Sequence, residues 1–205
     1  RDPEFKDCFW INPLGYHFSQ MKVSDLCLMN QNGELVYGKE RTGDAAQSIH
    51  SNIYKSRPDI NAVAHAHPMY GKTFSTLNKE LKPITQDSCA FYKRTATFTD
   101  YDGVANGPDE GINIAKALAD KDFLILQNHG ILTTGTMVET TLWYFLNMEE
   151  ACKSQLLAEA VGEPIVIPDK VAIHTRDYVA NDLSAFASIQ PLLDVLWEKE
   201  PEFLD

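Results

Sequence analysis

The sequence lacks any concentration of positive charge. Its 205 residues include 18 lysines and arginines against 29 aspartates and glutamates, which gives a net charge of -11 at pH 7. No cluster of basic side chains stands out, so the chain offers no patch for the phosphates of nucleic acid or for an anionic membrane surface. We therefore expect neither nucleic acid nor a membrane as a partner.

Long apolar runs and paired cysteines are also missing. No stretch approaches the ~20 apolar residues that a membrane helix needs, and nothing resembles a signal peptide. The four cysteines are scattered without a C-x-x-C pattern, which suits a reducing compartment better than a disulfide framework. Repeats, low-complexity segments and linkers are absent as well. These absences predict a cytoplasmic location and a single domain over residues 1–205.

The two ends of the sequence differ from its middle. Arg1 is not a methionine, and an apolar strand predicted over residues 8–11 follows almost at once. We therefore expect that an N-terminal part of the domain is missing. Residues 162–205 show weaker patterns and are predicted to form a C-terminal extension that packs on the domain or on a neighbouring subunit.

Strand-like and helix-like apolar patterns alternate along the chain. Strands are predicted at residues 8–11, 26–29, 34–37, 60–64, 84–91, 95–98, 123–126 and 131–134. Helices are predicted at residues 44–57, 70–77, 109–119, 137–161 and about 190–197. Asp44 or Thr42 is the expected N-cap of the first helix. The alternation has no strict βαβ rhythm, so it predicts helices flanking a mixed sheet.

A metal-binding pattern stands at the end of the strand predicted over residues 60–64. His65 and His67 are two residues apart, so in an extended chain their side chains point to the same face. A third histidine, His129, follows the apolar run 123–126 and precedes Gly130. Three imidazoles that leave coordination positions open are typical of a catalytic metal. We predict a three-histidine site for one divalent ion, with Zn favoured and Fe, Mn, Co or Ni as alternatives.

These motifs, in this order and spacing, resemble the class II aldolase/adducin head domain family, and residues 86–92 and 149–157 look typical of its fungal-type branch. The similarity covers residues 11 to about 160. The resemblance implies an α/β fold, a three-layer α/β/α sandwich with a central mixed, mostly antiparallel sheet. It also implies a divalent metal held by three histidines, and a homo-oligomer, usually a cyclic tetramer, with active sites between neighbours. An apolar surface for such contacts is offered by Leu192, Leu193, Leu196 and Trp197.

Several positions depart from the sugar-phosphate aldolases of this family. In those enzymes the helix before the metal strand begins with Ser-Ser-Glu, where the serines hold phosphate and the glutamate is the acid/base. This chain has Asp44-Ala45-Ala46 there, and Leu14 replaces a phosphate-binding threonine. Ala46 cannot move a proton, and Asp44 would repel a phosphate. The resemblance therefore implies a small non-phosphorylated carbonyl or keto-acid substrate.

The remaining site candidates are polar residues near these motifs. His17, on the turn that the family uses against its substrate, and Asp44 are the candidate catalytic residues, as proton donors or acceptors. Gly15, Tyr70 and Gln86 are the candidate substrate-binding residues. An ordinary surface role is the alternative interpretation for each of these side chains.

Other polar residues are candidates for supporting roles. Asp87 could orient a ligand histidine or form a hydrogen bond at a strand end. His50 is expected to pack or hydrogen-bond on its helix, and His174 could cover a neighbour's pocket. Three acidic residues of the helix over 137–161 are expected on a solvated face: Glu139, Glu149 and Glu150.

The leading hypothesis is a divalent-metal-dependent lyase that performs aldol-type carbon–carbon cleavage or decarboxylation, with the metal as a Lewis acid on a carbonyl oxygen. With Ala46 at the acid/base position, the proton must come from water, His17, Asp44 or a neighbouring subunit. One alternative is a non-haem iron oxygenase or decarboxylase on the same scaffold. The other is a non-catalytic, adducin-like interaction module, although such a module has no physical need for three converging imidazoles.

Overall fold

The structure is a computed structural model that describes residues 1–38, 42–101, 103 and 108–205. The chain divides into two compact units. The first comprises Arg1–Ile60, Gly103–Lys116 and Pro191–Asp205, and the second comprises Asn61–Asp102 and Ala117–Gln190. Whether residues 1–205 behave as one domain stays a prediction. None of the helices in the described part of the chain is long and apolar enough to cross a bilayer.

The first unit contains a small antiparallel sheet with the strand order β1-β2-β3. Its strands are β1 (Cys8–Ile11), β2 (Cys27–Asn30) and β3 (Leu35–Tyr37), each within a residue or two of its predicted place. Gly33, with φ of +94°, lies in the turn between β2 and β3, where the Asn-Gly pair favours a hairpin. The same unit carries α1 (Asp44–Ser56), most of α3 (Pro108–Leu118) and three short 3₁₀ helices: η1 (Phe18–Gln20), η2 (Val23–Asp25) and η4 (Pro201–Leu204).

The predicted N-cap of α1 is wrong. The cap residue is Gly43, which has an extended backbone, and Asp44 is the first residue of the helix itself. An acidic side chain in the first turn is still favourable, because the helix dipole places partial positive charge there. His50, on the same helix, packs as expected: its ring stacks near Phe9 at a centroid distance of 6.4 Å. Removal from water lowers the pKa of His50 to about 4.

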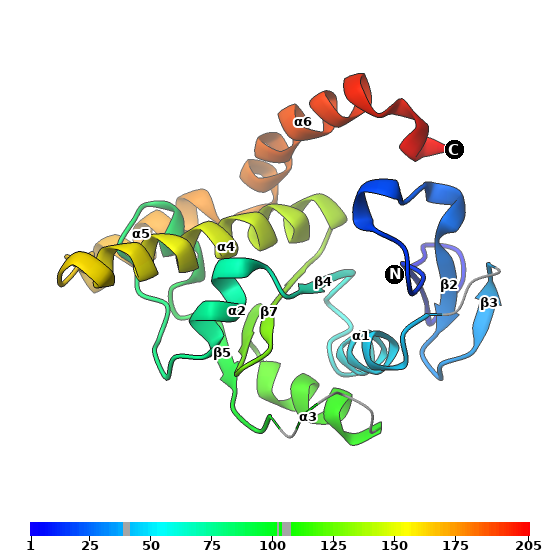
Figure 1. The fold of residues 1–205 in the computed structure, drawn as a ribbon, viewed down its shortest axis with the longest axis horizontal. Helices are drawn as coiled ribbons and strands as arrows, with labels where there is room; N and C mark the ends of the chain where they lie inside the picture. Colours follow the sequence, from blue (N-terminus) through cyan, green and yellow to red (C-terminus); the bar gives the residue numbers. More distant parts are fainter. Residues whose placement is uncertain (39–41, 102, 104–107) are drawn as a thin grey trace. The chain divides into compact units, whose positions relative to one another are not determined.

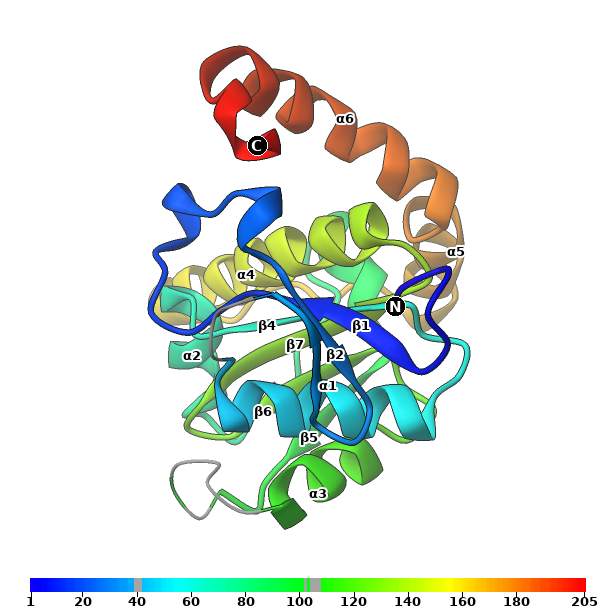
Figure 2. The same cartoon turned by 90° about the vertical axis from the view of Figure 1, so that its right-hand side faces the viewer.

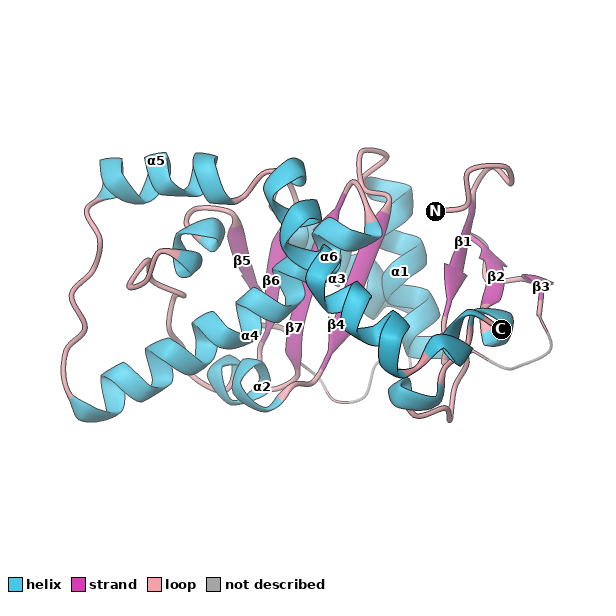
Figure 3. Cartoon of the chain, turned by 90° about the horizontal axis from the view of Figure 1, so that it is seen from above, coloured by secondary structure: helices cyan, strands magenta, loops and turns pink. Residues whose placement is uncertain are grey.

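The second unit is built on a four-stranded mixed sheet with the order β4-β7-β6-β5, seen side by side in Figure 3. Its strands are β4 (Ala62–Ala66), β5 (Thr95–Phe98), β6 (Phe123–Leu126) and β7 (Gly130–Gly135). The β4–β7 and β6–β7 pairs are antiparallel and the β5–β6 pair is parallel. All four residues of β6 are buried, as its continuous apolar sequence predicts.

Helices α2 (Met69–Ser75) and α4 (Val138–Val161) pack against each other and against this sheet (Figure 1). The core between them is rich in aromatic side chains, which bury the largest apolar areas. Its fully or almost fully buried members include Phe74, Phe91, Phe123, Ile131, Tyr144, Met148 and Cys152. This core fixes α2 and α4 relative to the strands that carry the predicted metal ligands.

The strand predicted over residues 84–91 is wrong, because the segment forms the 3₁₀ helix η3 (Asp87–Phe91). Local side-chain hydrogen bonds stabilise the turn at its start. The Ser88 hydroxyl oxygen accepts from the backbone N–H groups of Ile84 and Thr85, each at 2.9 Å. Thr85 Oγ1 in turn accepts from the Ser88 N–H at 3.1 Å. Such local bonds compete with the extended ladder that the apolar pattern favours.

The C-terminal region is more helical than its sequence indicates. It contains α5 (Asp169–Val179) and α6 (Asp182–Lys199), which follow one another in the orange and red part of Figure 2. Only Ala172 of α5 is buried. Pro191 lies inside α6, where proline normally signals a helix end. The predicted helix over 190–197 is therefore the second half of a longer one.

Cys89 and Cys152 should not react in the folded protein. Both thiols are buried, and desolvation raises the pKa of each, that of Cys152 to about 12. At about pH 8 the reactive thiolate is therefore scarce as well as inaccessible. Iodoacetamide labelling followed by peptide mass spectrometry should modify both residues in denaturant and neither in native buffer. Fast native labelling of Cys152 would contradict this packing.

Candidate metal centre

Three histidines meet at one end of the β4–β7–β6 ladder. His65 lies in β4, His67 follows the last residue of that strand, and their alternation places them on one face. His129 lies in the short turn between β6 and β7, whose flanking residues Leu126 and Gly130 are ladder partners. The antiparallel pairing of Ala66 with Ile131 brings the turn to the end of β4. All three histidines belong to the second unit.

The three imidazoles face a common point. Their ring centroids are 5.2 Å apart for His65 and His67, 4.9 Å for His65 and His129, and 4.5 Å for His67 and His129. One ligand atom from each ring lies within 4.8 Å of those of the other two. Nitrogens that each bind one zinc ion at ~2.0–2.1 Å are ~3–4 Å apart, so small side-chain adjustments allow a shared ion.

A backbone carbonyl orients the first of these rings. Nδ1 of His65 lies 3.0 Å from the carbonyl oxygen of Ile131. A carbonyl can only accept, so Nδ1 carries the proton and donates it. Nε2 then keeps its lone pair, which is the tautomer that a metal ligand needs. The same strand that follows His129 thus sets the orientation of His65.

The surroundings favour the neutral form of His67 and of His129. His65 and His129 are half-buried and His67 is exposed. Desolvation lowers the pKa of His67 and of His129, and a smaller repulsive contribution comes from Lys72 at His67 and from His67 at His129. Neutral imidazole is the metal-binding form. A donor set of three imidazole nitrogens with one exposed side fits a divalent ion that keeps coordination positions open for substrate.

Two glycines allow the close approach on which this geometry depends. A Cβ atom on Gly130 would lie 2.5 Å from the carbonyl oxygen of Ala66 and 3.1 Å from a ring carbon of His67. A Cβ atom on Gly71, in α2, would lie 2.9 Å from the Ile131 side chain. Larger residues at either position would push the turn or the helix away from the end of β4.

Tyr101 is a neighbour of the centre that the sequence did not reveal. Its ring centroid lies 6.2 Å from that of His129, with an interplanar angle of 52°. The parallel register of β5 and β6 pairs Phe98 with Leu126, so the residues that follow the two strands emerge side by side. Only that register, and no local motif, could have indicated the contact.

Tyr70 lies close to the histidines in sequence and is anchored to α4. It occupies the first turn of α2, and the Lys153 ammonium lies 5.3 Å from its ring centroid. Its backbone N–H donates to Glu149. The expectation that Glu149 belongs to a solvated helix face is therefore wrong, because its carboxylate accepts two backbone hydrogen bonds from α2.

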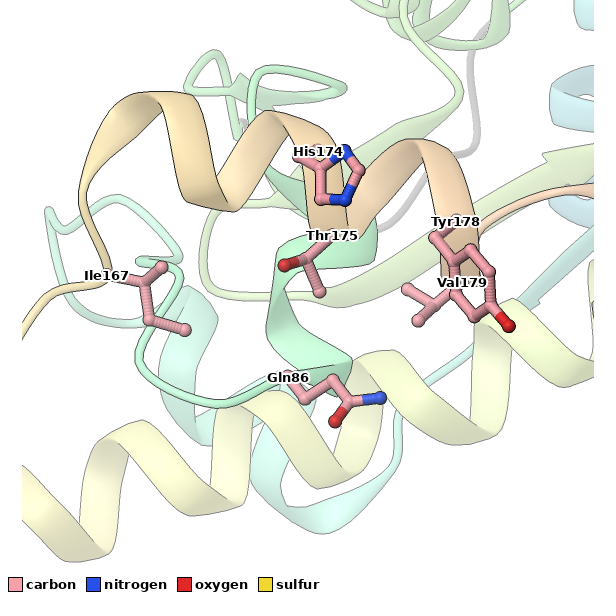
Figure 4. Close-up of a pocket in the computed structure, with 6 residues that line it drawn as sticks. All are labelled: Gln86, Ile167, His174, Thr175, Tyr178 and Val179. Atoms are coloured by element: carbon pink, nitrogen blue, oxygen red, sulfur yellow. The ribbon is translucent and has the colours of Figure 1, made fainter.

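Gln86 lines a separate hollow of about 430 Å³, and none of the three histidines lines it. Figure 4 shows Gln86, at the start of η3, across from four side chains of α5. The hollow combines polar groups with aliphatic ones, in a ring of Gln86, Ile167, His174, Thr175, Tyr178 and Val179. It lies wholly within the second unit.

Gly15, His17 and Asp44 belong to the first unit. Gly15 has φ of +90° in the turn after β1. His17 is the N-cap of η1, exposed, with Nδ1 2.7 Å from the Ser19 hydroxyl oxygen. Asp44 is exposed at the start of α1, where it borders a polar hollow of about 390 Å³ together with Gln47. Their candidate roles in catalysis and substrate binding stay predictions.

Residues 1–156 match the family model for the "Class II Aldolase and Adducin N-terminal domain". Among related proteins, "Decarboxylase NovR" of Streptomyces niveus is 37% identical over 202 residues, which cover 98% of this chain and 75% of the relative. A protein of Streptomyces roseochromogenus subsp. oscitans, "4-hydroxy-3-prenylphenylpyruvate oxygenase/4-hydroxy-3-prenylbenzoate synthase", is also 37% identical, with 98% and 73% covered.

A similar solved structure carries a different name. The "L-fuculose 1-phosphate aldolase" of Glaciozyma antarctica PI12 superposes with a TM-score of 0.90 at 40% identity. The match covers 100% of this chain and 81% of that protein. The likeness confirms the α/β fold with a mixed sheet that the sequence predicted.

Each of the three histidines should be needed for metal uptake. The wild-type chain should retain about one divalent ion after dialysis, because three nitrogens converge on one point. Most of that metal should be lost in each of three variants, His65→Ala, His67→Ala and His129→Ala. The metal content is measured by inductively coupled plasma mass spectrometry. His50→Ala, on α1, removes a histidine outside the cluster and should leave the metal content unchanged. Metal content that survives the His129 change would refute the three-histidine site.

Proposed function

Because the chain belongs to the class II aldolase and adducin N-terminal domain family, we propose that it is a divalent-metal-dependent lyase. The reaction is aldol-type carbon–carbon cleavage or decarboxylation of a small carbonyl or keto-acid substrate without phosphate. The observation that carries this proposal is the convergence of His65, His67 and His129, whose ligand atoms lie within 4.8 Å of one another.

The three imidazoles would hold the metal, with Zn as the favoured ion and Fe, Mn, Co or Ni as alternatives. When bound, a divalent ion would supply Lewis acidity at a carbonyl oxygen, which would stabilise the negative charge left on the remaining fragment when CO₂ or a carbonyl fragment departs. The backbone carbonyl of Ile131 keeps the Nε2 lone pair of His65 available by accepting a hydrogen bond from Nδ1–H. The exposed side at His67 leaves room for substrate.

The substrate class follows from side chains that cannot hold a phosphate. Leu14 is exposed and apolar, Asp44 is exposed and acidic, and Ala45 has no hydrogen-bonding group. Ala46 likewise cannot transfer a proton. The proton that completes the reaction would therefore come from water, His17, Asp44 or a neighbouring subunit. A substrate that carries its own carboxylate, such as an α-keto acid, needs no phosphate-binding residues.

The names of the relatives favour different substrates. A related protein with 37% identity is called a decarboxylase, which agrees with a keto-acid substrate. The solved structure with 40% identity is called an L-fuculose 1-phosphate aldolase. We give more weight to the residues at positions 14 and 44–46, because binding a phosphate requires donors or positive charge that these side chains lack.

We further propose a cytoplasmic homo-oligomer, a tetramer, in which neighbouring subunits complete the substrate site. Gly15, Tyr70 and Gln86 are the proposed substrate-binding residues. The exposed apolar side chains of Leu192 and Trp197, 54% and 60% accessible, provide surface for subunit contacts. Resemblance to the family supports this assembly.

An iron-dependent oxygenase or decarboxylase is the second candidate function. The observation in its favour is the 37% identical relative whose name includes an oxygenase of a phenylpyruvate. Three histidines can bind Fe(II), but the usual facial triad of such enzymes contains a carboxylate. The metal cluster contains no carboxylate among the described residues, so the lyase remains the preferred function.

The lyase should work with a redox-inert metal and without oxygen. Apo-protein loaded with Zn(II) or with Fe(II) should cleave a 4-hydroxy-2-oxo acid or decarboxylate a β-keto acid under nitrogen as well as in air. The same small panel contains 4-hydroxyphenylpyruvate as a substrate that only an oxygenase could convert. Product formation is followed by chromatography beside an oxygen electrode. His129→Ala, prepared in the same way, is the matched control and should show no turnover.

One outcome would contradict the lyase reaction, and another would contradict the substrate class. Oxygen uptake that matches product, and only in the Fe(II) sample, would establish the oxygenase instead. Efficient release of triose phosphate from L-fuculose 1-phosphate in the same panel would show that the substrate class is wrong while the reaction type is right.

A further inference from the structure

We propose that Glu149 is a positioning residue for the metal centre, acting through helix α2. The inference rests on the proposed three-histidine metal site and concerns what holds that site in shape. Glu149 lies on α4, far from the histidines in sequence, and its carboxylate is bonded to the backbone of α2. Its effect reaches the histidines through that backbone.

The carboxylate of Glu149 accepts two N–H groups at the start of α2. Oε1 accepts from the N–H of Tyr70 at 2.8 Å, and Oε2 accepts from the N–H of Gly71 at 2.6 Å. These donors belong to the second and third residues of the helix, which have no intrahelical acceptor. The N-cap residue, Pro68, provides no side-chain bond. Glu149 therefore serves as the cap that the local sequence does not supply.

The short length of α2 makes this cap important. The helix has 7 residues, and helices shorter than ~12–15 residues are marginal on their own. A negative charge at its N-terminus also interacts favourably with the helix dipole. Because α2 starts directly after His67 and Pro68, its first turn determines the direction in which the chain leaves His67.

From its fixed first turn, α2 contacts the segments that carry the other two histidines. Gly71 lies against the side chain of Ile131, and the carbonyl of Ile131 orients His65 at 3.0 Å. At the other end of the helix, the Ser75 carbonyl accepts from the N–H of Asn128 at 3.1 Å. Asn128 precedes His129. Helix α2 thus joins all three ligand-bearing segments, and Glu149 attaches it to α4.

Helix α4 is a suitable anchor because it is fixed in the core. Met148 and Cys152, on either side of Glu149 in sequence, are 0% exposed. The next residue along the helix, Glu150, is exposed and lies 3.3 Å from the ammonium of Lys153 on the same helix. Glu150 has the same charge as Glu149 but pairs within α4. It is therefore the matched control position for Glu149.

The test compares Glu149→Ala, Glu149→Gln and Glu150→Ala with the wild-type chain in two measurements. Hydrogen–deuterium exchange of the apo-protein measures how strongly the backbone N–H groups of Tyr70 and Gly71 are protected from solvent. Calorimetric titration with Zn(II) reports metal affinity. Glu149→Ala should speed exchange at residues 69–72 and weaken zinc binding by about 10- to 100-fold, the usual effect of losing a supporting partner of a metal site.

The conservative variant should give a partial effect. The amide side chain in Glu149→Gln keeps one accepting oxygen but loses the second acceptor and the negative charge. This variant should therefore fall between wild type and Glu149→Ala in both measurements. Glu150→Ala should match wild type in both. If Glu149→Ala does not fold, Glu149→Gln decides the question by the same two measurements.

The results separate this inference from the metal site itself. Failure of the wild-type chain to bind zinc would overturn the metal site and this inference together. Normal zinc binding by the wild type, with unchanged affinity in a folded Glu149→Ala, would overturn this inference alone. Faster exchange in α2 without weaker zinc binding would also overturn it, because Glu149 would then stabilise the helix without positioning the ligands.

Discussion

The antiparallel pairing of β4 with β7 is the interaction on which the candidate site depends. It sets Ala66 opposite Ile131, and so brings the end of a strand that carries two histidines to the turn that carries the third. The same register directs the Ile131 carbonyl to Nδ1 of His65. A slip of one residue would turn the alternating side chains of β4 to the other face and would remove both effects. The backbone ladder therefore determines the ligand geometry and the tautomer of one ligand together.

The second unit contains the groups that form and support the metal centre. The sheet supplies the ligands, α2 joins their segments, and α4 ties α2 to an aromatic core through Glu149. Glycines at positions 71 and 130 permit approaches that any side chain would obstruct. This dependence on buried packing explains how an exposed ligand such as His67 can be held in place: its neighbours on both sides belong to rigid elements. The groups proposed for proton transfer, His17 and Asp44, belong to the other unit.

The sequence predicted the strands and the histidine cluster well because both have local signals. A histidine pair two residues apart at the end of an apolar run is readable from alternation alone, and the apolar run of β6 ends three residues before His129. Prediction from the sequence failed where tertiary contacts or local side-chain hydrogen bonds determine the structure. Residues 84–91 have a strand-like composition, but Thr85 and Ser88 close them into a 3₁₀ helix. In the sequence, Glu149 has the pattern of an exposed acidic residue, and its role depends on the packing of α2 against α4. Tyr101 approaches His129 only through the parallel register of β5 and β6, which no short motif encodes.

The most direct test of the account is X-ray absorption spectroscopy of the metal-loaded protein. A zinc-loaded sample should show nitrogen or oxygen neighbours at ~2.0–2.1 Å, with outer-shell scattering that requires three imidazole rings, and His129→Ala should reduce the fitted number to two or abolish metal binding. Sulfur scattering at ~2.3 Å, or a zinc environment without imidazole, would place the metal elsewhere and contradict the central claim that His65, His67 and His129 form one site.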